Sequence, residues 1–144
     1  MYTHILVPTD GSELSDKATQ AAIELAKRLG ARLHAFTVTE PYPYSPLAEA
    51  QPILPQEFLD AARSQADRFL KRVRELAAAA GVACEGSHVE AAQPWRAICE
   101  RAGELGCHCI VMASHGRSGL AGLLLGSETQ KVLTHCQLPV LVVR

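Results

Sequence analysis

The chain alternates segments with the apolar spacing of strands and segments with the apolar spacing of helices, and this alternation restricts its fold most. Segments rich in apolar and β-branched residues indicate strands at 4–8, 32–39, 82–89, 108–113 and 139–143. Between them, apolar residues recur at helical intervals in segments 13–29, 56–80, 94–105 and 127–134. This order favours a parallel sheet with helices on both faces. We therefore expect an α/β fold with an open five-stranded parallel sheet.

The length and composition predict one globular domain over residues 1–144. The net charge of -1 leaves no basic footprint for a nucleic acid or an anionic membrane. No apolar run is long enough to cross a bilayer, and the first residues lack the pattern of a signal peptide. We expect a cytoplasmic protein that binds neither nucleic acid nor membrane.

The cysteine content favours reduced thiols. There are five cysteines, an odd number. The run Cys107-His108-Cys109 could suggest a metal site, but it leads directly into an apolar strand and no second cluster has zinc spacing. Packing as small buried thiols is the simpler interpretation. We therefore predict no protein-bound metal.

Two strand ends carry polar residues. The first predicted strand is followed by 9–12, Thr-Asp-Gly-Ser, and the fourth by 114–117, Ser-His-Gly-Arg. Ligands of open α/β sheets bind at the carboxyl ends of strands, where the strand order reverses, so we expect these two strands to be neighbours there. Asp10 could form a turn with its own backbone, or accept a ribose hydroxyl or a metal ion. His115 and Arg117 could face solvent, and Arg117 could instead pair with a phosphate.

A glycine-containing loop, GRSGLAGLLLGS, follows the fourth strand. Gly116 and Gly126 have nine residues between them, and Ser127 begins the last predicted helix. Backbone approaches a ligand closely at glycine, and the first N–H groups of a helix can bind a phosphate. Ser127 could instead only cap its helix, with Gln130 completing a capping box. Gly119 and Gly122 are expected to ease the turn, and neither standard nucleotide-binding loop is present.

Together, these strand ends and the glycine-containing loop match a known pattern. The chain resembles the universal stress protein family over essentially its whole length. The start HILVPTDGSELSDKAT and the end VMASHGRSGLAGLLLGSETQKVLTHCQLPVLVVR carry the likeness. The nucleotide-binding branch of that family has the pattern G-2x-G-9x-G-[ST]. Gly116, Gly126 and Ser127 match it, and Ala113 stands at the first glycine position.

The resemblance implies a Rossmann-like sheet of strand order 3-2-1-4-5, a homodimer, and ATP in the crevice, accompanied by a divalent cation such as Mg²⁺. It implies that Thr9 and Asp10 face the ribose, that Val38 presents backbone to adenine, and that Met112 and Ala113 pass under the nucleoside. Gly116, Gly126, Ser127 and Glu128 would offer N–H groups to the phosphates. The full candidate nucleotide-binding set is Thr9, Asp10, Val38, Met112, Ala113, His115, Gly116, Arg117, Gly126, Ser127, Glu128 and Thr129.

Three functions remain open at this point. The first is an ATP-binding regulatory module of the stress response, with protein partners that the sequence does not identify. The second is a slow ATPase, for which Asp10 and His115 are the only candidate groups and no catalytic residue is assigned. The third is a dimeric stress protein that binds no nucleotide. The apolar last strand, 138–143, is expected to form the homodimer contact through its free edge.

Overall fold

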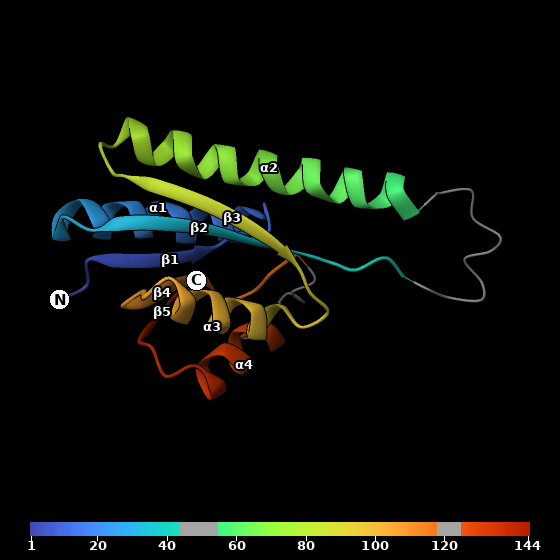
Figure 1. Ribbon diagram of the computed structural model, residues 1–144. Coiled ribbons are helices and arrows are strands. Elements are labelled where there is room, and N and C mark those ends of the chain that lie inside the picture. The colour runs from blue at the N-terminus through green and yellow to red at the C-terminus, as the bar shows by residue number, and fades with distance from the viewer. Residues whose placement is uncertain (44–54, 118–124) are drawn as a thin grey trace.

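A parallel sheet forms the centre of the protein, in a computed structural model that describes residues 1–43, 55–117 and 125–144 (Figure 1). The strand order is β3-β2-β1-β4-β5. This confirms the predicted fold class and strand order. The strands are β1 (His4–Pro8), β2 (Arg32–Thr39), β3 (Cys84–Glu90), β4 (Cys109–Ala113) and β5 (Val140–Val143).

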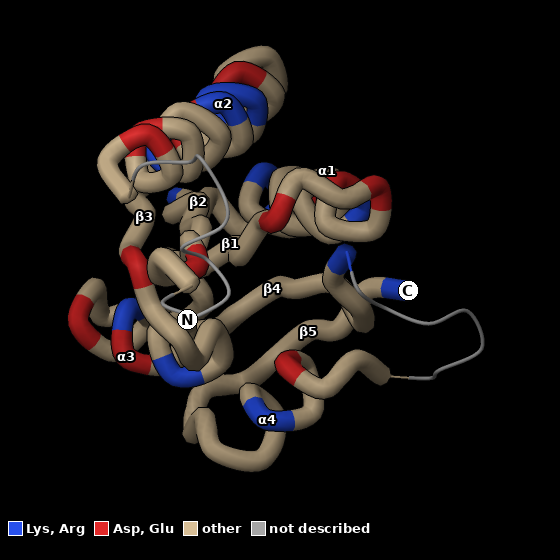
Figure 2. The backbone as a smooth tube through the Cα atoms, turned by 90° about the vertical axis from the view of Figure 1, so that its right-hand side faces the viewer, with Lys and Arg blue, Asp and Glu red and all other residues tan. Residues whose placement is uncertain are grey.

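Two layers of helices enclose the sheet. Helices α1 and α2 lie on one face and α3 and α4 on the other, as the two perpendicular views show (Figures 1 and 2). The described helices are α1 (Glu13–Leu29), α2 (Pro55–Ala79), α3 (Pro94–Glu104) and α4 (Ser127–His135). Within the described ranges, none of them is long and apolar enough to cross a membrane.

Strands β1 and β4 are buried on both faces because their alternate side chains enter different layers. Ile5 and Val7 of β1 pack in the cluster that α1 completes, whereas Leu6 packs with Phe36 and Ile110 against α3 and α4. Their segments are therefore apolar almost throughout. The strand order reverses between β1 and β4, which pair in parallel through Ile5–Cys109 and Leu6–Ile110. The crevice expected of such a fold lies at the carboxyl ends of these two strands.

The helix limits follow local signals. Ser12 caps α1 by accepting a hydrogen bond from the Ser15 N–H at 3.2 Å. Gly30 ends α1 with a φ of 64°, in the left-handed region that glycine favours.

Two details of the predicted pattern are wrong. Val82 lies outside β3, because its N–H donates to the Ala77 carbonyl at 2.9 Å and so completes the end of α2. The helical spacing of apolar residues in 56–80 predicts that Leu76 belongs to the apolar stripe of this helix, but Leu76 is 37% exposed and Ala77 is buried instead. Of the predicted loop 40–55, residues 44–54 lie outside the described residues.

Two buried histidines, His4 and His34, lie on the same face of the sheet as Leu6 and Phe36. Their ring centroids are 6.4 Å apart. Burial lowers the pKa of both imidazoles; the nearby Arg32 lowers the pKa of His4 further, and His4 lowers that of His34. The His34 Nε2 lies 2.8 Å from the Ser87 hydroxyl, whereas its Nδ1 has no hydrogen-bond partner among the described residues.

We therefore expect the free energy of unfolding to decrease when the pH falls from about 7.5 to about 5.5, because the unfolded chain then binds protons that the folded chain excludes. Urea denaturation at the two pH values measures the decrease. His34→Gln removes one of the two groups and should reduce the decrease. An unchanged decrease in that variant would show that His34 does not contribute to it.

Candidate functional site

Asp10 links the carboxyl ends of β1 and β4. Its Oδ1 accepts a hydrogen bond from the Ser12 N–H at 3.0 Å, and its Oδ2 accepts one from the Arg117 N–H at 2.9 Å. This confirms that the two polar strand ends are neighbours. Asp10 does form a turn with its own backbone, yet each carboxylate oxygen can accept another hydrogen bond. The turn therefore leaves Asp10 able to accept a ligand hydroxyl.

Gly116 allows the Asp10 carboxylate to come this close. A Cβ at Gly116 would lie 2.8 Å from Asp10 Oδ2. A side chain there would therefore push the carboxylate away from the Arg117 N–H. Gly116 therefore has a structural role that does not depend on a bound ligand.

Thr9 supports the same turn from within. Its side chain is buried, and its hydroxyl lies 3.3 Å from the Ser15 hydroxyl and accepts from the Gly11 N–H at 3.3 Å. Its carbonyl accepts from the Thr37 hydroxyl at 3.0 Å. The Thr9 side chain therefore faces the interior, and Asp10 is the residue of this pair that faces the crevice side.

Gly126 joins α4 to the end of β4. Its N–H donates to the Ser114 carbonyl at 2.6 Å, so this N–H is not available to a phosphate, contrary to the sequence-based expectation. A Cβ at Gly126 would lie 3.2 Å from the Ser114 carbonyl oxygen and 3.3 Å from the His115 Cα. Glycine is therefore needed here for close backbone packing.

The capping-box interpretation of Ser127 is wrong. Gly126, with a φ of -71° and a ψ of 158°, is the N-cap of α4 and provides no side chain to cap it. The Gln130 N–H donates to the Gly126 carbonyl at 3.0 Å, whereas the Gln130 side chain reaches the Leu125 carbonyl. Ser127 is instead the first helical residue. The N–H groups of residues 127–129 precede the first hydrogen bond of the helix, where an anion binds most readily.

The side chains of Thr129 and Glu128 hold α4 in place. The buried Thr129 hydroxyl donates to the Ala113 carbonyl at 2.9 Å, at the last residue of β4. Glu128 Oε2 accepts a hydrogen bond from the Trp95 N–H at 2.8 Å, at the start of α3, and Oε1 lies 3.3 Å from Lys131 Nζ. Both side chains therefore have partners within the protein, whereas the backbone N–H groups of these two residues belong to the first turn of α4, which has no intrahelical acceptors for them. No pattern in the sequence indicates the contact between Glu128 and Trp95.

The remaining predicted residues lie at or just beyond the carboxyl ends of β2 and β4. Met112 and Ala113 are buried at the end of β4, and Val38 packs at the edge of the core shared by α3 and α4. The Ser114 hydroxyl lies 2.9 Å from His115 Nδ1. Gly119 and Gly122 lie outside the described residues.

Phe69 of α2 connects the two loops, a contact that the sequence did not reveal. Gly11 is required for two reasons. A Cβ there would overlap the Phe69 ring, and its φ of 75° lies in the left-handed region that glycine favours. The Arg117 guanidinium lies 4.9 Å from the centroid of the same ring. The aromatic ring therefore packs against both the β1 turn and the β4 loop.

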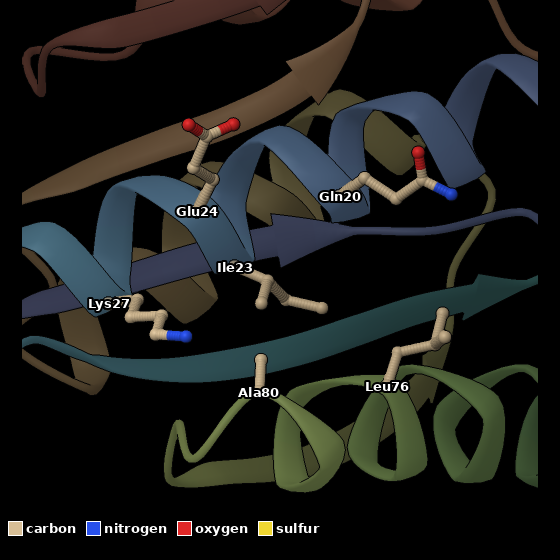
Figure 3. Close-up of a pocket in the computed structure, with 6 residues that line it drawn as sticks. All are labelled: Gln20, Ile23, Glu24, Lys27, Leu76 and Ala80. Atoms are coloured by element: carbon tan, nitrogen blue, oxygen red, sulfur yellow. The ribbon is translucent and has the colours of Figure 1, made fainter.

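A shallow groove of about 290 Å³ lies between α1 and α2 (Figure 3). Its walls are Gln20, Ile23, Glu24 and Lys27 of α1 with Leu76 and Ala80 from the end of α2. Because α1 runs back from the carboxyl end of β1, this groove lies toward the opposite end of the sheet. It therefore does not belong to the crevice.

The cysteines beside β4 pack as buried thiols, as predicted. Cys107 and Cys109 are both buried, and burial, with a smaller effect of Cys109, raises the pKa of Cys107 to about 11. In the parts of the chain that the structure describes, no group of three histidine, cysteine or acidic residues could hold a metal ion.

A parallel sheet of this strand order, enclosed by helices on both faces and with polar residues at the carboxyl ends of β1 and β4, defines a Rossmann-like α/β protein. The chain belongs to the universal stress protein family, whose family model matches residues 1–144. A universal stress protein of Methanocaldococcus jannaschii is 34% identical over 145 residues, covering 100% of this chain and 83% of that protein. The universal stress protein YxiE of Bacillus subtilis is 34% identical over 149 residues and is matched over 100% of both chains.

Solved structures agree with this assignment. The universal stress protein UspA from Lactobacillus plantarum matches with a TM-score of 0.85 and 26% identity, over 99% of this chain and 98% of that one. A universal stress protein solved in complex with cAMP matches with a TM-score of 0.73 and 31% identity, over 99% of this chain and 97% of that one. Structural relatives of this protein thus include one that binds a nucleotide.

Proposed function

We propose that the protein binds ATP with Mg²⁺ at the carboxyl ends of β1 and β4 and acts as a nucleotide-dependent regulatory module of the stress response. The main support is the position of α4. Its first turn is fixed against the end of β4 by the Gly126–Ser114 hydrogen bond, beside the turn that carries Asp10. The helix N-terminus attracts phosphate, and a nearby carboxylate suits a ribose hydroxyl.

The candidate residues then divide by chemistry. Asp10 would accept from the ribose, and the backbone of Val38 with the apolar Met112 and Ala113 would contact the nucleoside. The N–H groups of Ser127, Glu128 and Thr129, with the Ser127 hydroxyl, would face the phosphates. His115, Gly116 and Arg117 form the loop beside them, and Thr9 supports the Asp10 turn.

The metal ion would enter with the nucleotide. The phosphates carry several negative charges that the partial charges of a helix terminus only partly balance. A divalent cation on the phosphates supplies the rest. The phosphate oxygens, and not a protein side chain, would hold this cation, because such oxygen ligands suit Mg²⁺.

Calorimetry with Mg-ATP tests this proposal. We expect a dissociation constant between about 1 μM and 1 mM. AMP should bind more weakly than ATP, because it lacks two of the phosphates that α4 would contact. Absence of binding at millimolar Mg-ATP would contradict the proposal. Equal affinity for AMP and ATP would exclude α4 as the site of the outer phosphates.

The remaining parts of the proposal concern the whole molecule. We propose that the 144 residues act as one domain and that the protein resides in the cytoplasm, where its free thiols would remain reduced. We also propose a homodimer formed by antiparallel pairing of β5, an edge strand, with the β5 of a second copy.

Leu141→Lys is expected to convert the homodimer into monomers. Leu141 is 47% exposed at the centre of β5, so a lysine there charges the contact without disturbing the core. A charge at the neighbouring Val142 would be a less specific test of the contact, because Val142 is half-buried within its own chain. Light scattering at tens of micromolar protein measures the mass. Leu133→Lys, on the exposed face of α4, is the control and should remain dimeric. A monomeric wild type would exclude the contact.

A further inference from the structure

Helices α3 and α4 make specific contacts where they pack side by side on one face of the sheet (Figures 1 and 2). The Trp95 ring of α3 lies against the His135 ring of α4, with their centroids 4.5 Å apart. The Trp95 N–H also donates to Glu128 at the start of α4. These contacts fix the position of each helix relative to the other.

Two cysteines lie next to this contact. Cys99 follows Trp95 by one helical turn, and Cys136 directly follows His135. Both thiols are free and half-buried, and both pack against the core cluster that includes Ile98 and Val132. Cys136 lies close enough to Cys99 to raise the pKa of the Cys99 thiol. The packing of α3 against α4 and the shared core cluster therefore bring the two cysteines near each other in the folded protein.

We propose that Cys99 and Cys136 form a reversible modification site, at which a low-molecular-weight disulfide such as oxidised glutathione converts the two thiols into a disulfide. The proposal does not depend on nucleotide binding. First, a Cys136 thiolate attacks the small disulfide, forms a mixed disulfide and releases one small thiolate. The Cys99 sulfur then attacks the Cys136 sulfur, and the second small thiol leaves. The two cysteines lose two electrons and two protons, and the small disulfide gains them.

The surroundings of the pair indicate this order of attack. Burial, and to a smaller extent the neighbouring Cys136, raises the pKa of Cys99, which disfavours the Cys99 thiolate as the first nucleophile. Cys136 lies just beyond the end of α4, where the chain leaves the helix. Cys136 is therefore the first sulfur to react, and Cys99 resolves the mixed disulfide.

The other cysteines do not compete for this bond. Cys107 and Cys109 are buried, and burial raises the pKa of both thiols. Cys84 packs against the core clusters on the opposite face of the sheet, next to α1 and α2. The fold therefore selects one partner for Cys136.

The test incubates the folded protein with oxidised glutathione at about pH 8, where thiolates are more abundant. After acid quenching, intact mass spectrometry should show a loss of two hydrogens, and peptide mapping should show a Cys99–Cys136 link. Reduced glutathione should reverse both changes. Cys99→Ser should stop at a glutathione adduct on Cys136. The control variant Cys84→Ser, which removes a half-buried thiol elsewhere, should behave like the wild type.

The oxidised protein should also unfold at a higher urea concentration than the reduced protein, because the link restricts the unfolded chain. Circular dichroism identifies any serine variant that fails to fold, and the corresponding alanine variant then replaces it. A folded wild type that forms no intramolecular disulfide would overturn the proposal. A link between any other pair, or a link that persists in Cys136→Ser, would overturn it as well.

Discussion

Gly126→Val is expected to weaken Mg-ATP binding by at least about 100-fold, which corresponds to about 2.7 kcal/mol. The atoms that a Cβ would meet, the Ser114 carbonyl oxygen at 3.2 Å and the His115 Cα at 3.3 Å, both belong to the backbone and cannot rotate away. The first turn of α4 must therefore move away from β4 and take its N–H groups with it. Calorimetry measures the affinity, and circular dichroism checks the fold.

Gly103→Val is the matched control for this substitution. Gly103 lies within α3, and a Cβ there would meet no atom within 4 Å. Valine also has a better helix propensity than glycine, so the control should fold and bind as the wild type does. If Gly126→Val also binds Mg-ATP with wild-type affinity, the phosphates do not contact the first turn of α4.

Leu6→Ala is expected to lower the free energy of unfolding by about 2–5 kcal/mol, the range observed when a buried leucine leaves a cavity. Leu6 is 0% exposed in the central strand β1 and belongs to the core cluster that includes Phe36 and residues of α3. Because a domain has only about 5–15 kcal/mol of stability, this loss is a large fraction of the total. Urea denaturation measures it.

Leu29→Ala makes the same chemical change at the surface. Leu29 is 46% exposed at the end of α1, and its truncation should change the free energy of unfolding by no more than about 0.5 kcal/mol. Similar losses in the two variants would contradict the assignment of Leu6 to the central core.

The fold could be predicted from the sequence because its signals are local. Apolar strands such as 109–113 and helix-ending glycines such as Gly30 act on neighbouring residues, and together they specify each element. The order of the strands came from the family resemblance. The wrong details occur where a local pattern is ambiguous. Val82 has the character of a strand residue but completes the end of α2, and Leu76 has helical spacing but lies over the groove between α1 and α2.

The candidate site could be predicted in its composition but not in its connections. Asp10, Gly116 and Gly126 were identified because glycines and polar residues at strand ends are unusual in an apolar sheet. Their hydrogen bonds join residues far apart in the chain, such as Asp10 and Arg117, and no local pattern encodes such a pair. The same applies to Glu128, whose side chain binds the start of α3. The capping alternative for Ser127 is wrong, because a capping pattern does not reveal that the preceding glycine is already the cap.

Phe69 places α2 in contact with both loops at the carboxyl edge of the sheet. The ring is shared by the Gly11 turn and the Arg117 guanidinium, so neither loop can shift far without changing what the ring touches. A ligand that draws Arg117 toward itself uncovers one face of that ring. The exposure of the Phe69 ring, and not only the position of Arg117, would then depend on whether the site is occupied.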